Sequence, residues 1–115
     1  MILLDGLRTV PGMNVREHHM ARFRRVRDEK ERVAWELSRQ PEKPPIPCVC
    51  MLIRFAPSNG LDDDNLTGAL KGVRDAVAAW LGVDDRDRKR VLYVYEQERG
   101  PWGVGIGFAP MEKLG

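Results

Sequence analysis

The sequence predicts an α+β domain in which a small mixed sheet of three to four strands carries two main helices. Apolar residues recur at helical spacing over residues 66–81, and a second helical pattern covers residues 15–39. Because 115 residues suit one hydrophobic core, we expect a single domain over residues 1–115. Three further segments have the length and composition of strands, at residues 48–55, 91–98 and 104–108. We expect residues 99–103 to form a hairpin turn between the last two.

The chain opens with a short apolar segment, residues 1–4, that we expect to form a strand before a turn at residues 11–12. Asn14 is a favourable helix N-cap, and Glu17 three residues later completes a capping-box pattern. The helix over residues 15–39 should pack through one apolar stripe, formed by Phe23, Val26, Val33 and Leu37.

The other faces of this helix are rich in arginine. Two interpretations are open: ion pairs with acidic neighbours in solvent, or contacts with nucleic-acid phosphates, which the fixed donor fork of arginine favours. On the second interpretation, the DNA-binding residues are Arg16, Arg24 and Arg25. Four prolines within residues 41–47 then end the helix and form a stiff connector.

Residues 48–55 have the composition of a central strand, since they are apolar on both faces except at Arg54. Cys48 and Cys50 lie too close in sequence for an ordinary disulfide, and with no other cysteine they cannot form a zinc site alone. We therefore expect two core residues in a reducing compartment, and hence a cytoplasmic protein. No apolar run approaches the roughly 20 residues of a membrane span, so we expect no membrane partner.

Two acidic groups bracket the amphipathic helix of residues 66–81. Adjacent carboxylates raise the cost of ionising one another, so a positive group normally lies beside them. A helix N-cap with solvated neighbours explains the first group, whereas a bound metal ion explains both. A turn at Gly82 would let the second group fold back toward the first. The groups are Asp62, Asp63 and Asp64 before the helix, and Asp84, Asp85 and Asp87 after it.

Charge is distributed unevenly along the chain. Residues 1–40 carry nine Lys or Arg against six Asp or Glu, whereas residues 61–87 carry three against seven. A negative centre in a basic frame is unusual for a plain nucleic-acid-binding protein. It is expected where metal ions neutralise the centre and the frame binds phosphates.

The segment over residues 61–85 resembles the signature of the RusA-type Holliday-junction resolvases. That family has Asp-x-Asp-Asn at a helix start, a lysine and an aspartate inside the helix, and an Asp-Asp pair after it. The family lysine falls at Gly68 in this chain, and the nearest lysine is Lys71, one turn further along the same face. The matching positions are Asp62, Asp64, Asn65, Asp75, Asp84 and Asp85.

The resemblance implies a RusA-like fold and a dimeric, Mg²⁺-dependent endonuclease that cuts four-way DNA junctions in recombination and repair, of phage or prophage type. It implies catalytic roles for Asp62, Asp64, Lys71 and Asp85. The metal ligands would be Asp62, Asp64 and Asp85, with Asp84 as the alternative to Asp85. Carboxylates suit Mg²⁺, with Mn²⁺ as a substitute, and Lys71 would offset charge at the scissile phosphate. The implied partners are branched DNA and a second copy of the chain, without a small-molecule cofactor.

A second hypothesis belongs to another functional class. The chain would be a non-catalytic DNA-binding or phage accessory protein whose acidic cluster is structural, with a helix cap and a network of ion pairs. Lys71, Arg74 and Arg86 would then be the partners of the aspartates. Thermal stability with and without a divalent metal separates the two hypotheses, since only a metal site gains stability from the metal.

Overall fold

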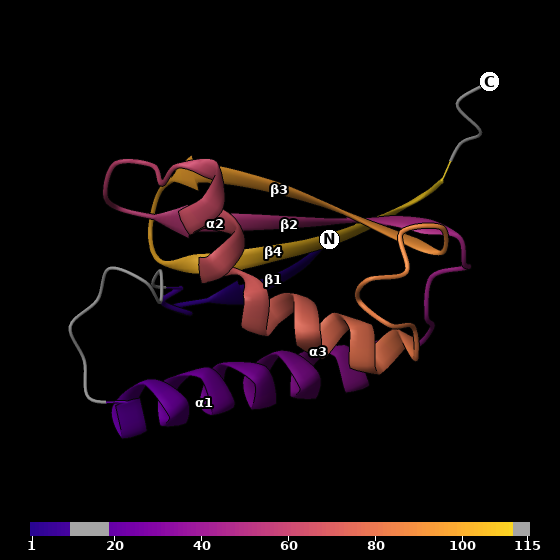
Figure 1. Ribbon diagram of the computed structural model, residues 1–115, viewed down its shortest axis with the longest axis horizontal. Helices are drawn as coiled ribbons and strands as arrows, with labels where there is room; N and C mark the ends of the chain where they lie inside the picture. Colours follow the sequence, from indigo (N-terminus) through magenta and orange to yellow (C-terminus); the bar gives the residue numbers. More distant parts are fainter. Residues whose placement is uncertain (10–18, 112–115) are drawn as a thin grey trace.

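The computed structural model describes residues 1–9 and 19–111 of the chain. The predicted start of the first helix at residue 15, and with it Arg16, lies outside the described residues. Figure 1 shows the path of the chain through strand, helix, strand, two helices and two strands. The elements are β1 (Ile2–Asp5), α1 (His19–Ser38), β2 (Cys48–Ala56), α2 (Asp63–Ala69), α3 (Lys71–Leu81), β3 (Val91–Arg99) and β4 (Gly103–Pro110).

The strands form one mixed sheet in the order β1-β4-β2-β3. β2 and β3 run parallel, and β4 is antiparallel to both β1 and β2. The predicted α+β class with a small mixed sheet is therefore confirmed. The predicted hairpin turn over residues 99–103 is wrong, because β2 lies between β3 and β4. The connection instead crosses the end of β2, where the Gly100 amide donates to the Ala56 carbonyl, and spans two strand spacings of about 4.8 Å each.

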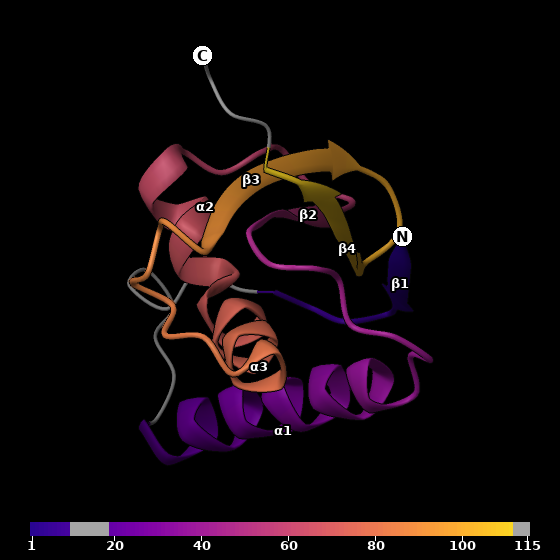
Figure 2. The same cartoon turned by 90° about the vertical axis from the view of Figure 1, so that its right-hand side faces the viewer.

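α1 and α3 lie on the same side of the curved sheet and pack against each other, while α2 lies near β3 (Figure 2). The core fills the space between this pair of helices and the sheet. β2 is the centre of this core, because both of its neighbours pair with it along most of its length. The fully buried side chains include Leu4, Leu52 and Ile106 from the sheet, Val33 and Leu37 from α1, and Val73 and Val77 from α3.

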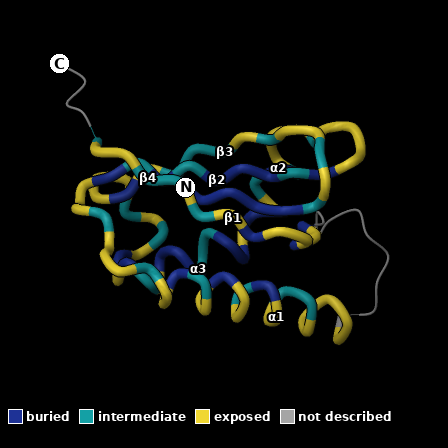
Figure 3. Tube along the Cα trace, turned by 180° about the vertical axis from the view of Figure 1, so that it is seen from behind, coloured by how far each residue is buried: buried dark blue, intermediate teal, exposed yellow. Residues whose placement is uncertain are grey.

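α1 alternates between buried and exposed residues along its length (Figure 3). Val33 and Leu37 are fully buried, as predicted, but Phe23 is 63% exposed, so its predicted place in the core stripe is wrong. Phe23 belongs to the first turns of α1, which extend past the start of α3 (Figure 1). Glu29, 5% exposed, lies in the buried stripe instead, one turn before Val33. None of the described helices has both the length and the apolar character needed to cross a membrane.

The predicted helix of residues 66–81 is divided into α2 and α3 at Leu70, whose φ of −99° and ψ of 5° are not helical. Gly68 and Gly72 flank this break, and each is about 1 kcal/mol less favourable than alanine inside a helix. Gly82 ends α3 in the left-handed conformation with a φ of 70°, as the sequence predicted. The apolar face remains continuous across the break, since Leu66, Leu70, Val73, Val77 and Leu81 are all buried.

The side of the sheet that faces away from α1 and α3 is apolar along β2, with Asp5, Glu96 and Glu98 on the two edge strands. No described helix covers it (Figures 1 and 2). Gly105 of β4 lies on this side, and a Cβ built there would be 3.1 Å from the Met1 sulfur. Leu3 is 60% exposed and Leu92 is 41% exposed. We call this surface the open sheet face. By strand register its apolar residues are Met1, Leu3, Val49, Met51, Ile53, Phe55, Leu92 and Val94.

Candidate metal site and adjoining pocket

The first acidic group lies at the start of α2, in the chain that follows β2. Asp62 is the N-cap: its Oδ1 accepts a hydrogen bond from the backbone N–H of Asn65 at 2.8 Å. Its Oδ2 accepts another from the Asn65 side chain at 3.1 Å. Asp63 and Asp64 occupy the first turn and are exposed. None of the three carboxylates forms an ion pair with a described residue, so no described side chain balances their charge.

The second acidic group, in contrast, is balanced by arginine. Arg74 forms an ion pair with Asp85. It donates a hydrogen bond to the Tyr95 hydroxyl at 2.8 Å, and this bond holds its guanidinium beside Asp85. A backbone hydrogen bond from Arg86 is the main cause that lowers the pKa of Asp84. The closest ion-pair distances are 3.5 Å for Asp84 with Arg86, 3.3 Å for Asp85 with Arg74, and 2.8 Å for Asp87 with Arg90.

The predicted convergence of Asp62, Asp64 and Asp85 within one chain is wrong for the described residues. Because β2 and β3 are parallel, the loop that leaves β2 and the loop that enters β3 lie at opposite ends of these strands. Gly82 does turn the chain back, but Asp85 then reaches Arg74. Accordingly, no three His, Cys, Asp or Glu side chains in residues 1–9 and 19–111 are close enough together to hold a metal ion.

The donor chemistry at the start of α2 nonetheless fits Mg²⁺. This ion prefers oxygen ligands, keeps several waters, and is often held by one or two carboxylates together with substrate phosphates. Asp62 and Asp64 provide two carboxylates, and the two hydrogen bonds on Asp62 leave further lone pairs available. The residues present therefore offer two carboxylate donors of the kind that Mg²⁺ prefers, one fewer than the sequence predicted.

Lys71 lies on the polar side of α3, as predicted, with 64% of its side chain exposed. Its Nζ is 3.4 Å from Asp75 Oδ2, and Lys30 Nζ from α1 is 3.3 Å from the same oxygen. Exposed ion pairs are worth about 0–1 kcal/mol, so Lys71 can leave Asp75 at little cost. The structure thus gives Lys71 a partner other than the first acidic group, and leaves its predicted catalytic role a prediction.

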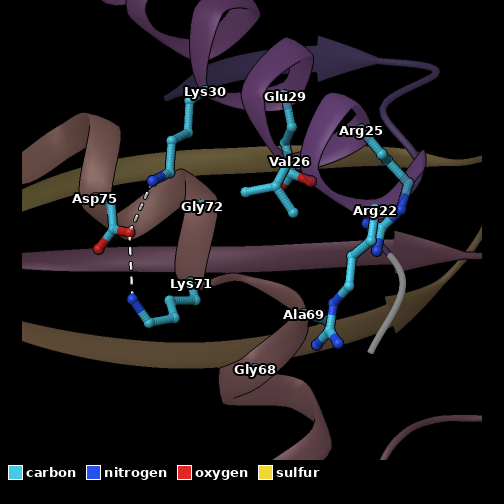
Figure 4. Close-up of a pocket in the computed structure, with 10 residues that line it drawn as sticks. All are labelled: Arg22, Arg25, Val26, Glu29, Lys30, Gly68, Ala69, Lys71, Gly72 and Asp75. Atoms are coloured by element: carbon cyan, nitrogen blue, oxygen red, sulfur yellow. Dashed lines mark hydrogen bonds and ion pairs between the residues drawn. The ribbon is translucent and has the colours of Figure 1, made fainter. Parts of the chain in front are cut away.

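The predicted DNA-binding arginines of α1 have different surroundings. Arg24 is exposed, whereas Arg25 is half-buried and lines a pocket between α1 and the pair of α2 and α3 (Figure 4). Arg22, which the sequence analysis did not select, lines the same pocket. Helical spacing could have predicted Arg22 as a neighbour of these residues, because it lies three residues before Arg25 and four before the half-buried Val26.

A buried carboxylate forms part of the pocket wall. The Oε1 atom of Glu29 has no hydrogen-bond partner among the described residues. It packs against α3 at Gly72, where a Cβ would lie 3.3 Å from that oxygen. Burial raises the pKa of Glu29 from its ordinary 4.5 to about 7, although Arg25 and Lys30 act to lower it.

We expect the free energy of unfolding to decrease as the pH rises from about 4.5 to about 7. The native state binds the Glu29 proton more tightly than the unfolded chain does, so ionisation costs stability across this interval. Glu29→Gln should remove this pH dependence, which is worth a few kcal/mol at most, since one pKa unit corresponds to about 1.4 kcal/mol. Urea unfolding of both proteins between about pH 4 and pH 8 measures it. An equal loss of stability in the variant would show that another group titrates.

No family model matches the chain, and neither a curated protein nor a solved structure does. The functional conclusion therefore rests on the residues of this chain and on their arrangement.

Proposed function

We propose that this chain is a Mg²⁺-dependent endonuclease that cuts four-way DNA junctions, as the RusA-type signature over residues 61–85 implies. It would act in the cytoplasm, in recombination and repair of phage or prophage type. The observation that carries the proposal is the contrast between the two acidic groups. Each aspartate at positions 84, 85 and 87 has an arginine partner, whereas those at positions 62–64 have no cationic partner among the described residues.

Uncompensated neighbouring carboxylates favour a cation from outside the chain. Asp62 and Asp64 are the residues that would hold Mg²⁺, and the DNA phosphate would complete its ligands together with water. A bound Mg²⁺ would supply an activated water and stabilise the leaving oxygen of the phosphodiester. The N-cap hydrogen bonds of Asp62 fix its carboxylate before substrate arrives, which limits the ordering needed on binding.

The basic side chains of α1 and α3 support DNA as the substrate. Lys71 can leave its exposed pair with Asp75 and offset negative charge at the scissile phosphate. Arg24 and Arg25 of α1 provide donors for backbone phosphates, a contact that is largely independent of sequence. Such contacts suit an enzyme that selects the shape of a branched DNA.

A homodimer would provide the two equivalent sites that paired cuts in a four-way junction require. The open sheet face supports this assembly. It has apolar side chains along β2 and an exposed leucine on each edge strand, Leu3 and Leu92, and sheets commonly bury such faces by packing on one another. We propose that a second copy of the chain covers it through the same face, as closed two-fold symmetry requires.

One observation favours the second hypothesis, a non-catalytic DNA-binding or phage accessory protein. Each basic residue that this hypothesis names has an aspartate partner: Lys71 with Asp75, Arg74 with Asp85, and Arg86 with Asp84. These pairs account for the second acidic group without a metal. On this hypothesis the first acidic group is a helix cap, Asp62, with two solvated neighbours, Asp63 and Asp64. We prefer the nuclease because three adjacent carboxylates have no cationic partner among the described residues.

Addition of Mg²⁺ should raise the melting temperature of the parent protein. A ligand at 100 times its dissociation constant stabilises the native state by about 2.7 kcal/mol. Asp64→Asn should lose most of this gain, whereas Asp87→Asn, which removes a carboxylate already paired with Arg90, should keep it. Thermal unfolding with Mg²⁺, with Mn²⁺ and with EDTA measures the effect. A melting temperature that no divalent metal changes would favour the accessory protein.

A further inference from the structure

The pocket between α1 and the pair of α2 and α3 has a volume of about 150 Å³ and a lining rich in charge. A single oxygen of Asp75 lies 3.3 Å from the ammonium group of Lys30 and 3.4 Å from that of Lys71, so two cations share one negative charge (Figure 4). The described residues of the lining therefore carry more positive than negative charges. Its cationic members are Arg22, Arg25, Lys30 and Lys71, and its acidic members are Glu29 and Asp75.

Glu29, one of the two acidic residues, opposes an anion only weakly near neutral pH. Glu29 is buried in the wall, and burial raises its pKa to about 7, so a substantial fraction of it is protonated there. The groups that face it are Arg25 and Lys30 on its own helix and the backbone at Gly72 on α3. α2 contributes only Gly68 and Ala69 to the pocket, and neither of them titrates.

Small residues leave the pocket open on the side of α2. A Cβ built at Gly68 would meet no atom within 4 Å, and the guanidinium of Arg22 points toward Gly68 and Ala69 (Figure 4). Gly68 lies four residues after Asp64, so both occupy one face of α2, one turn apart. An anion at Gly68 would therefore lie about one helical turn from Asp64.

We propose that this pocket binds one phosphate group of the DNA backbone and so positions the strand beside Asp64. Arginine presents a fixed fork of donors that matches phosphate oxygens, and the lysines add mobile ammonium groups. A water needs roughly 10–15 Å³ of such space, so the pocket accommodates a phosphate group with accompanying waters. The phosphate chemistry stands on the pocket alone, whereas its assignment to DNA rests on the proposed function.

The first test changes charge at the pocket mouth without a large change in shape. Gly68→Glu and Gly68→Gln add side chains of equal length into open space, and both residues are better helix formers than glycine. Affinity for a synthetic four-way junction is measured without divalent metal, so that cleavage plays no part. We expect Gly68→Glu to bind at least about ten-fold more weakly than Gly68→Gln, since only the carboxylate repels a phosphate.

The second test removes one cation from the pocket. Arg22→Gln should reduce the slope of log affinity against log salt by about 1, the signature of one lost phosphate contact. Arg27→Gln is the matched control. Arg27 lies on the same helix outside the pocket lining, with 53% of its side chain exposed and a 3.5 Å contact to Asp28. Its slope should equal that of the parent.

A further measurement identifies the source of the phosphate. Binding of inorganic phosphate to the parent and the variants is detected as a rise in melting temperature in thermal unfolding. A pocket for DNA requires that the Gly68 and Arg22 variants lose junction affinity. If they lose only a stabilising effect of inorganic phosphate and bind the junction as the parent does, the assignment to DNA is wrong. If neither ligand distinguishes the variants from the parent, the phosphate pocket itself is wrong.

These outcomes are independent of the nuclease proposal. A parent protein that never cuts the junction, with variants that bind it weakly, would leave the pocket in place and remove the nuclease. A parent protein that cuts, with variants that bind and cut normally, would remove the pocket and leave the nuclease.

Discussion

Asp64→Asn should abolish cleavage of a four-way junction and leave junction binding nearly unchanged. Asparagine keeps the size of the side chain but removes the negative charge that holds a divalent cation. Because the site provides only two carboxylates from one chain, loss of one should reduce the cleavage rate by at least about 10²–10³-fold, the range for loss of one preorganised electrostatic group. Single-turnover cleavage of a labelled junction in Mg²⁺ measures the rate, and binding in EDTA measures the affinity.

Two neighbouring variants make this result specific. Asp63→Asn removes an exposed carboxylate of the same turn that is not an expected ligand, so its cleavage rate should stay within a few-fold of the parent rate. Asp62→Asn should lose cleavage at nearly unchanged stability, since asparagine is as good an N-cap as aspartate. Equal losses for Asp63→Asn and Asp64→Asn would indicate a general effect of negative charge, which contradicts metal ligation.

Leu3→Lys should convert the proposed dimer into a monomer. Leu3 lies on the open sheet face, and closed two-fold packing through this face would bury two introduced lysines per dimer. Burial of an unpaired charge costs several kcal/mol, so we expect the dimer dissociation constant to rise by more than about 100-fold. Light scattering at micromolar concentration should give a mass near 13.1 kDa for the variant and twice that for the parent.

Phe23→Lys is the control for surface apolarity in general. Phe23 is 63% exposed and Leu3 is 60% exposed, but Phe23 lies on α1, away from the open sheet face. The Phe23 variant should remain a dimer. If Phe23→Lys dissociates the dimer and Leu3→Lys does not, the interface lies on α1. A monomeric parent, even with junction DNA added, would contradict the paired-incision mechanism.

Local pattern in the sequence predicted most of the secondary structure. The length and composition of the apolar segments located the strands, and the recurrence of Leu66, Leu70, Val73 and Val77 located the buried face of α2 and α3. Gly82 ended α3 as expected, because only a residue without a Cβ readily adopts its φ of 70°. Asp62 caps a helix for an equally local reason, its hydrogen bonds to Asn65. These features depend on neighbours within a few residues.

Features that depend on strand direction and long-range packing were not predictable in this way. Spacing alone suggested that Asp85 could meet Asp64, but the parallel pairing of β2 and β3 places the loops before α2 and after α3 at opposite ends of these strands. A turn of five residues suggested a hairpin, but β2 pairs with both β3 and β4. The buried Glu29 has no signal in a hydrophobic pattern, because a carboxylate does not count as apolar.

Incubation of the parent protein with a synthetic four-way junction in Mg²⁺ is the most direct test of the central claim. The account predicts symmetric nicks in two opposing strands that convert the junction into nicked duplexes, and no cleavage in EDTA. A junction that is fully bound yet remains intact in both Mg²⁺ and Mn²⁺ would contradict the account and leave the non-catalytic DNA-binding protein.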